Sequence, residues 1–203
     1  QQHLLLKFTK FQKKMFNLVL ASKSKVRKDI LDKHGINCIV EPSNVDEEPV
    51  KNSLLKEGAS PEIVSKNLAE LKANKISQKK SEIFVIGADS VIDLNGEIIS
   101  KPKTREEAFD ILSKLNDKIH YLISSVCISK NGIMVWNYTD KAELKMKKLS
   151  NEEMKEYLSK ISDEHLFAYN VYQIEGIGRS LFESIKGNEN TIMGLPVEKI
   201  KEY

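Results

Sequence analysis

The sequence predicts an α/β protein with a mixed sheet and flanking helices, and two observations carry this prediction. In the first half of the chain, short apolar runs typical of buried strands alternate with amphipathic helical segments, which favours parallel pairing. In the second half, two long strand-like runs flank Asn131-Gly132, a turn signal for an antiparallel hairpin. The hydrophobic share of 40% and the charged share of 30% are ordinary for a globular chain.

The first elements follow one another closely. Residues 16–22 (FNLVLAS) predict a short buried strand, and the next helix is expected to begin at a Ser24 N-cap and to end at Gly35. Residues 36–43 predict a second strand that runs into an acidic loop over 44–50. The first strand therefore leads directly into the N-terminus of the first helix.

The next helix has a strong start signal, because Ser60 is followed by Pro61 at the first helical position. Its buried stripe is expected to follow Val64, Leu68, Leu71 and Lys75, with Ile76 beside it and Lys72 at the margin.

The stretch after this helix pairs two short strands. Residues 85–89 predict a buried strand that ends at Asp89. After the Asn95-Gly96 turn, a second short strand is expected to end at Lys101-Pro102.

Two later helices are marked by capping-box patterns, and the predicted hairpin lies between them. Thr104 with Glu107 opens the first helix, and Ser150 with Glu153 opens the second. The rest of the chain is rich in glycine. Because no repeat or linker divides the chain, we expect residues 15–203 to form a single domain, with 1–14 as an upstream extension or an addition and Met15 as the natural start.

Composition excludes several classes of partner. The net charge of +3 comes from 32 basic and 29 acidic residues, and no basic stretch is interleaved with stacking aromatics, so we expect no nucleic-acid partner. No apolar segment approaches the roughly 20 residues that cross a bilayer, so we expect no membrane span. Cys38 and Cys127 lack metal-ligand spacing and are expected to be reduced thiols, which fits a cytoplasmic location.

Polar residues at the expected strand ends are the candidates for function. Ser22, Ser24 and Arg27 lie where the first strand meets its helix, and free N–H groups with a guanidinium there would suit a phosphate. The alternative is that Ser24 is only an N-cap and Arg27 a solvated side chain. Asp46 and Glu47 offer oxygen ligands for a divalent cation, unless the acidic loop is simply solvated.

Asp89 is the most informative of these residues. A carboxylate after Gly87-Ala88 would hold a metal or take a proton from water, and the alternative is that it caps a turn. Lys72 and Lys101 would add positive charge for phosphates. Together these residues match the requirements for cleaving a polyphosphate, and the chain lacks a GxxxxGK[ST] loop, so it is not a P-loop protein.

Several segments together resemble the Maf family of nucleotide pyrophosphatases, in order and approximate spacing: LASKSKVR, VDE, LAELKA, GADSVIDLNGEIISKPKT, YQIEGIG and TIMGLP. The resemblance covers essentially residues 18–196. It implies a two-lobed fold around a central cleft, frequent homodimers, and hydrolysis of nucleoside triphosphates to monophosphate and pyrophosphate with Mg²⁺ or Mn²⁺. By position, Ser22 and Arg27 resemble the triphosphate-binding start, Lys72 and Lys101 the phosphate-contacting lysines, Asp46 or Glu47 the loop carboxylate, and Asp89 the metal ligand or general base.

Three departures from the family pattern stand out. The common SPRR start is SKVR here, so one arginine is missing and Arg27 remains, and the usual Thr after GAD is Ser90. Where members that prefer dTTP and UTP carry a glutamine, this chain has Glu175. A carboxylate only accepts hydrogen bonds, which suits the adjacent donors of guanine, and the segment resembles the subgroup acting on 7-methyl-GTP. The alternative is that Glu175 faces a backbone amide or the metal.

Two functions remain open from the sequence. The first is an enzyme that removes modified nucleotides from the cytoplasmic pool. The second is a regulator that binds nucleotide or a division protein without turnover, since the family is associated with inhibition of septum formation, and the missing arginine supports it.

Overall fold

A computed structural model describes residues 18–203 of the chain. The chain divides into two compact units. Among the described residues, the first comprises 18–89 together with Ser124–Thr139 and Gly194–Tyr203, and the second comprises Ser90–Ile123 and Asp140–Met193. The expected extension over 1–14, the proposed start at Met15 and the beginning of the first predicted strand lie outside the described residues.

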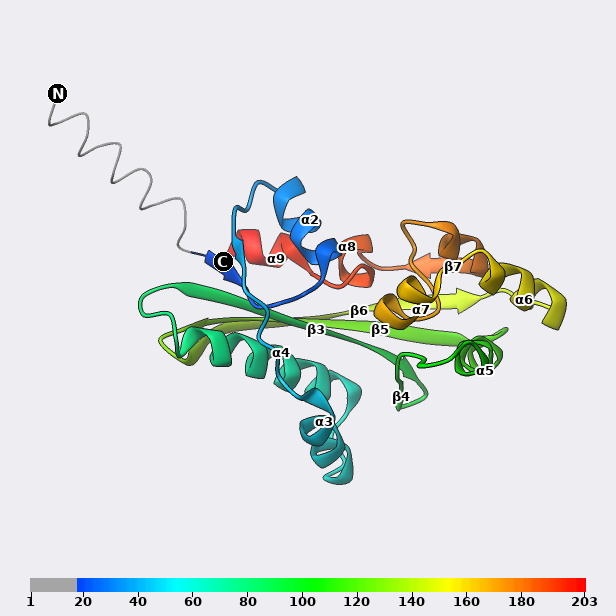
Figure 1. Cartoon of the computed structure of the whole chain (residues 1–203), viewed down its shortest axis with the longest axis horizontal. Coiled ribbons are helices and arrows are strands. Elements are labelled where there is room, and N and C mark those ends of the chain that lie inside the picture. The colour runs from blue at the N-terminus through cyan, green and yellow to red at the C-terminus, as the bar shows by residue number, and fades with distance from the viewer. Residues whose placement is uncertain (1–17) are drawn as a thin grey trace, which may run out of the picture. The chain divides into compact units, whose positions relative to one another are not determined.

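A seven-stranded sheet supplies the frame, with the strand order β2-β1-β3-β5-β6-β7 and with β4 paired to β3 (Figure 1). β1 runs parallel to β2 and to β3, whereas β4 is antiparallel to β3 and β7 is antiparallel to β6. The predicted mixed sheet is therefore confirmed. The strands are β1 (Leu18–Leu20), β2 (Ile39–Val40), β3 (Phe84–Leu94), β4 (Glu97–Ile99), β5 (Ile119–Lys130), β6 (Ile133–Met146) and β7 (Phe182–Lys186).

The predicted hairpin is confirmed as β5 and β6. Asn131 and Gly132 join these neighbouring strands with φ values of 52° and 79°. Both values lie in the left-handed region, as a type I′ turn requires, and a two-residue turn makes the strands antiparallel.

In the first unit, α2 and α9 lie on one side of the strands, and α3 and α4 lie on the other (Figure 1). Ser24 and Ser60 cap α2 and α4 as predicted, since their hydroxyls accept from backbone N–H groups in the first turn. Gly35 follows the end of α2 with φ 73°, which confirms the predicted stop. The helices are α2 (Lys25–Lys33), α3 (Glu47–Lys56), α4 (Pro61–Ser77) and α9 (Val197–Glu202).

Two predictions for this unit are wrong. The strand expected over 36–43 is only β2, whose Ile39 and Val40 are both exposed. The acidic loop expected over 44–50 ends at Asp46, because Glu47 is already the first residue of α3. None of the residues of α3 is buried, so its sequence has no apolar stripe that would predict a helix.

The second unit carries the helices that the capping boxes predict. Ser150 and Glu153 form the complete box at the start of α6. Thr104 caps α5, but the Glu107 carboxylate accepts from the backbone N–H of Lys103 instead of closing the box. The helices are α5 (Arg105–Leu115), α6 (Asn151–Ser159), α7 (Asp163–Tyr169) and α8 (Glu189–Ile192), with a 3₁₀ turn η1 (Ile177–Leu181) before β7.

The core of the second unit contains a buried polar pair. His120 on β5 is fully buried, and its Nε2 lies 2.9 Å from the hydroxyl of Tyr172. The ring of Phe182 packs against both side chains, and Nδ1 of His120 has no hydrogen-bond partner. Burial lowers the pKa of His120 to about 4, so the imidazole is neutral at physiological pH.

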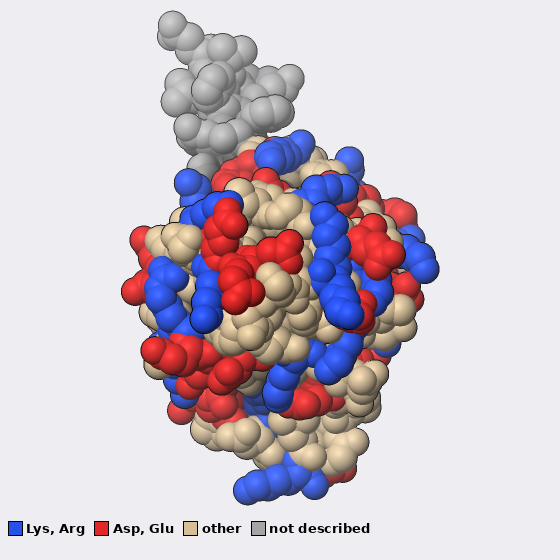
Figure 2. All heavy atoms as spheres, turned by 90° about the vertical axis from the view of Figure 1, so that its right-hand side faces the viewer, with Lys and Arg blue, Asp and Glu red and all other residues tan. Residues whose placement is uncertain are grey.

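Three further features of the described residues concern surface charge, membrane spans and cysteines. On the face shown in Figure 2, basic and acidic side chains are interspersed. Across residues 18–203, no helix combines the length and apolar character needed to cross a bilayer. Cys127 is buried and Cys38 is half-buried, and both are free thiols.

Candidate active site

Asp89 lies inside β3 and not at its end, so the predicted strand end is wrong. β3 continues beyond Asp89 to Leu94, and its last residues pair with β4. Asp89 is only 6% exposed, and a buried carboxylate is costly unless its charge is compensated. The compensation comes from Lys72 on α4.

Lys72 is an ion-pair partner of two carboxylates. Its Nζ lies 2.9 Å from Oδ1 of Asp89 and 3.0 Å from Oε1 of Glu47. The same ammonium also donates to the carbonyl of Ala88 at 3.4 Å. The three charged groups come from α4, β3 and α3, so the contact depends on tertiary structure.

The position of Lys72 differs from the sequence-based prediction, which placed it at the margin of the buried stripe. Leu71 and Lys75 are only half-buried, whereas Lys72 is 8% exposed and lies within the buried face of α4. That face also contains Pro61, Val64, Ser65, Leu68, Ala69, Ala73, Ile76 and Ser77.

Gly87 explains how α4 comes so close to β3. A Cβ atom at this position would lie 2.2 Å from the carbonyl oxygen of Ala69 and 2.6 Å from the backbone nitrogen of Ala73. The helix backbone therefore packs directly on the strand, and only glycine leaves room for it. This close approach brings Lys72 within reach of Asp89.

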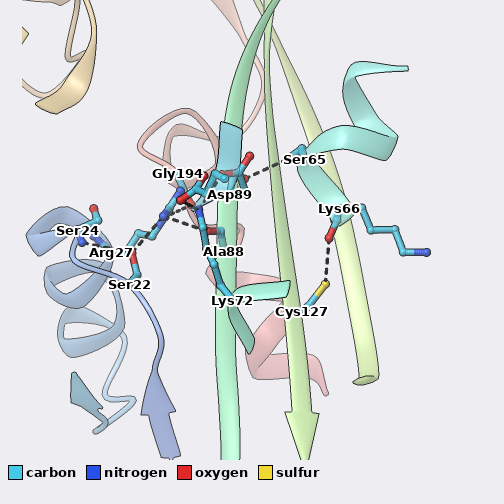
Figure 3. Close-up of polar contacts among 11 residues, drawn as sticks. Ser22, Ser24, Arg27, Ser65, Lys66, Lys72, Ala88, Asp89, Cys127 and Gly194 are labelled. Carbon is cyan, nitrogen blue, oxygen red and sulfur yellow. Dashed lines mark hydrogen bonds and ion pairs between the residues drawn. The ribbon is translucent and has the colours of Figure 1, made fainter. Parts of the chain in front are cut away.

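Arg27 is anchored, so the alternative of a solvated side chain is wrong. Its Nε donates to the carbonyl of Gly194 at 2.9 Å, and one terminal nitrogen donates to Ser22 Oγ and to the carbonyl of Ala88, both at 3.1 Å. Figure 3 shows Arg27 on α2 extending toward the β3 segment that carries Ala88 and Asp89. The guanidinium is thus a fixed positive charge beside the Asp89 segment.

The two serines differ in their roles. Ser24 is the N-cap of α2, and its hydroxyl accepts from the backbone N–H of Arg27 at 3.3 Å. The predicted N-cap role of Ser24 is therefore confirmed, and its part in binding phosphate stays a prediction. Ser22 is 7% exposed and accepts from both Ser24 N–H and Arg27, so it helps to hold the guanidinium.

We call Ser22, Arg27, Glu47, Lys72 and Asp89 the Asp89 cluster. Burial raises the pKa of Asp89, and the charges of Lys72 and Arg27 oppose this shift. Burial also lowers the pKa of Arg27, and Asp89 and Glu47 oppose that shift. Two cationic and two anionic groups therefore lie close together, with Lys72 and Asp89 buried and the side chain of Glu47 40% exposed.

The structure separates the two acidic candidates of the predicted loop. Glu47, the first residue of α3, is the carboxylate that contacts Lys72. Asp46 occupies the N-cap position of α3, is exposed, and makes no side-chain cap hydrogen bond. Of the two, Glu47 is the one that the fold brings to Asp89.

The donor set suits a hard divalent cation that completes its coordination with other ligands. Within residues 18–203, no group of three or more His, Cys, Asp and Glu residues is arranged to hold a metal. However, Oδ2 of Asp89 is buried without a hydrogen-bond partner, and Glu47 contacts the same ammonium as Asp89 does. Mg²⁺ typically binds one or two carboxylates together with substrate phosphates and water, so these residues fit it.

Lys101 and Glu175 belong to the second unit, and their participation in the site stays a prediction. Lys101 follows β4 and is exposed. Glu175 is also exposed, and its Oε1 accepts from the side-chain amide of Gln173 at 3.0 Å, not from a backbone amide. Asn170 links the two segments, because its side-chain amide donates to the carbonyl of Ser100 at 3.4 Å.

Sequence reasoning missed two groups that support the Asp89 cluster. The hydroxyl of Ser65, which is fully buried, donates to the backbone carbonyl of Asp89 at 3.1 Å (Figure 3). Ser65 precedes Lys72 by two helical turns on the same face, a spacing that could have indicated it. The carbonyl of Gly194 lies in the TIMGLP segment, but no residue pattern predicts which carbonyl holds an arginine.

The fold and the Asp89 cluster define an α/β protein with a charge-paired site suited to anionic phosphate ligands and a divalent cation. The chain belongs to the Maf family, since the family described as Maf-like protein matches residues 17–203.

Individual relatives agree with this assignment. The chain is 67% identical over 186 residues to a nucleoside triphosphate pyrophosphatase of Pelagibacter ubique, covering 92% of this chain and 95% of the relative. It is 38% identical over 180 residues to a 7-methyl-GTP pyrophosphatase of Bartonella henselae, covering 89% and 90%. A solved HAM1 protein from Coxiella burnetii matches with a TM-score of 0.45 and 14% identity over 65% of this chain and 73% of that one, which is too distant to support an argument.

Proposed function

We propose that this Maf-like protein hydrolyses nucleoside triphosphates to nucleoside monophosphate and pyrophosphate. The observation that carries the proposal is the ammonium of Lys72 placed between Glu47 and Asp89, beside the fixed guanidinium of Arg27. Two relatives named as pyrophosphatases, one of them 67% identical, support it.

Each group has a part in this reaction. Arg27 and Lys72 offset the negative charge of the phosphates, and Lys101 from the second unit would add a third positive charge. Water adds to the α-phosphorus, the bond between α-phosphorus and the bridging oxygen breaks, and pyrophosphate leaves. Asp89 has two possible parts, metal ligand and acceptor of the water proton, and both use its unpartnered Oδ2.

The proposed cofactor is Mg²⁺ or Mn²⁺. Glu47 and Asp89 would hold it, with Asp46 as the further acidic candidate at the start of α3. When bound, it would neutralise charge on the phosphate oxygens. We also propose a cytoplasmic homodimer, as the family resemblance implies.

For the substrate we propose a guanine-type nucleotide such as 7-methyl-GTP, in preference to dTTP or UTP. Glu175 supports this because a carboxylate accepts from the adjacent donors of guanine. The hydrogen bond from Gln173 to Oε1 holds that carboxylate in place, and each carboxylate oxygen has a second acceptor site.

A panel of nucleotide substrates tests both the proposed hydrolysis and the proposed base preference. We expect the protein with Mn²⁺ to release pyrophosphate from 7-methyl-GTP faster than from dTTP or UTP. Glu175→Gln, a matched substitution that keeps size and removes charge, is expected to shift the ratio toward the pyrimidines. Faster hydrolysis of dTTP or UTP by the unmodified protein would overturn the base preference. Tight nucleotide binding without turnover of any of them would favour the regulator instead.

A further inference from the structure

The ammonium of Lys72 contacts both carboxylates that would hold a divalent cation, Glu47 and Asp89. Its Nζ lies 3.0 Å from Oε1 of Glu47 and 2.9 Å from Oδ1 of Asp89. Both distances are those of direct ion pairs, and Lys72 is 8% exposed, so water screens its charge only weakly. The two carboxylates, which the proposed function assigns to a cation, are thus already paired with one.

An ammonium and a divalent cation at the same two carboxylates oppose each other's binding. The ammonium takes Oε1 of Glu47 and Oδ1 of Asp89 and leaves Oδ2 of Asp89 without a partner, so the opposition comes from the repulsion between the two positive charges at short range. Arg27 adds further positive charge there, because its guanidinium is held at the Ala88 carbonyl next to Asp89. A metal arriving alone therefore meets an occupied and repulsive site.

A triphosphate changes this balance. Its oxygens attract the ammonium, and they also add ligands for the metal that the protein lacks. The described residues contain no group of three acidic, histidine or cysteine side chains able to hold a metal, and Oδ2 of Asp89 is buried without a partner. Both observations fit a metal site that is complete only when nucleotide supplies the remaining oxygens.

We propose that Lys72 is a built-in countercation that keeps the divalent metal from binding until a triphosphate draws the ammonium away from Glu47 and Asp89. The inference deepens the proposed function and rests on it for the identity of the anion. Its consequence is positive coupling, in which metal and nucleotide each strengthen the binding of the other.

The test is direct binding of Mn²⁺ to the protein without nucleotide, measured by electron paramagnetic resonance or calorimetry. We expect Lys72→Met to bind Mn²⁺ about tenfold or more tightly than the unmodified protein, because the competing charge is gone. Lys75→Met is the matched control, since it removes a lysine one turn away that donates to the carbonyl of Asn44. Its Mn²⁺ affinity is expected to equal that of the unmodified protein.

Lys72→Gln guards against a folding defect, because the amide keeps a hydrogen-bond donor for the carboxylates without the charge. Circular dichroism establishes that each variant is folded. Equal or weaker Mn²⁺ binding by the folded variants would overturn the inference. If neither variant folds, the Mn²⁺ affinity of the unmodified protein is measured with and without a non-hydrolysable triphosphate. We expect the triphosphate to raise this affinity, and an unchanged affinity would overturn the inference.

The binding assay separates this inference from the proposed function. Tighter Mn²⁺ binding by the Lys72 variants, together with no hydrolysis of any triphosphate by the unmodified protein, would support the countercation role and refute the proposed enzyme. Hydrolysis that is lost in the Lys72 variants, together with an unchanged Mn²⁺ affinity, would refute the countercation role and support the enzyme.

Discussion

Substituting Gly87 with alanine tests whether the close packing of α4 on β3 builds the Asp89 cluster. The new methyl would lie 2.2 Å from the carbonyl oxygen of Ala69 and 2.9 Å from the Cβ of Ala73. Contacts below 3.0 Å cannot persist, and the atoms concerned belong to a helix backbone, so α4 must move by about 1 Å. Overpacking of this kind costs about 1–3 kcal/mol of stability. Because a displacement of about 1 Å in a catalytic group can cost roughly 10²-fold in rate, we expect a loss of that order in kcat/KM through misplacement of Lys72.

Urea unfolding and pyrophosphate release measure the two effects of Gly87→Ala. Gly35→Ala is the matched control, because Gly35 has φ 73° and a methyl group added there would have no atom within 4 Å. The control therefore costs backbone strain of about 1 kcal/mol without displacing α4. We expect it to lose stability and to keep its kcat/KM. Unchanged stability and activity in Gly87→Ala would refute the packing argument, as would an equal loss of activity in the control.

Two further predictions concern buried groups outside the cluster. The pKa of His120 is about 4 in the folded protein against 6.5 for a free histidine, so the unfolded chain binds more protons between these values and stability falls as the pH falls from 6.5 to 4. The total loss of unfolding free energy is about 3 kcal/mol. His120→Phe should abolish this pH-dependent loss, measured by urea unfolding at several pH values. An identical pH dependence in the variant would contradict a buried, neutral His120. Burial raises the pKa of Cys127 to about 12, so a thiol reagent should label Cys38 alone in the native protein, and labelling of Cys127 before unfolding would contradict its burial.

Local signals in the sequence predicted the hairpin and four of the helices, α2, α4, α5 and α6. Ser24, Ser60, Thr104 and Ser150 all cap helices as expected, because a cap depends only on a hydroxyl and the next few backbone N–H groups. The same reasoning failed where no local signal exists. Helix α3 buries none of its residues, so it lacks the periodicity that marked a predicted helix such as α4.

The composition of the site was easier to predict than its geometry. A carboxylate in a strand indicates an end or a turn by local rules, yet β3 continues through Asp89 because Lys72, far from it in sequence, neutralises the charge. Arg27 is held by Gly194, which lies 167 residues further along the chain. Such contacts follow from the fold and not from a pattern of neighbouring residues.

Asp89 is the proposed centre of the chemistry, and Asp89→Asn tests that claim most directly. The amide has the same size and can still accept from Lys72, so the variant is expected to fold, whereas it neither takes a proton nor binds a hard cation well. Pyrophosphate release from 7-methyl-GTP with saturating Mn²⁺ should fall by roughly 10²-fold or more in kcat. A folded Asp89→Asn variant that releases pyrophosphate at the rate of the unmodified protein would contradict the central claim.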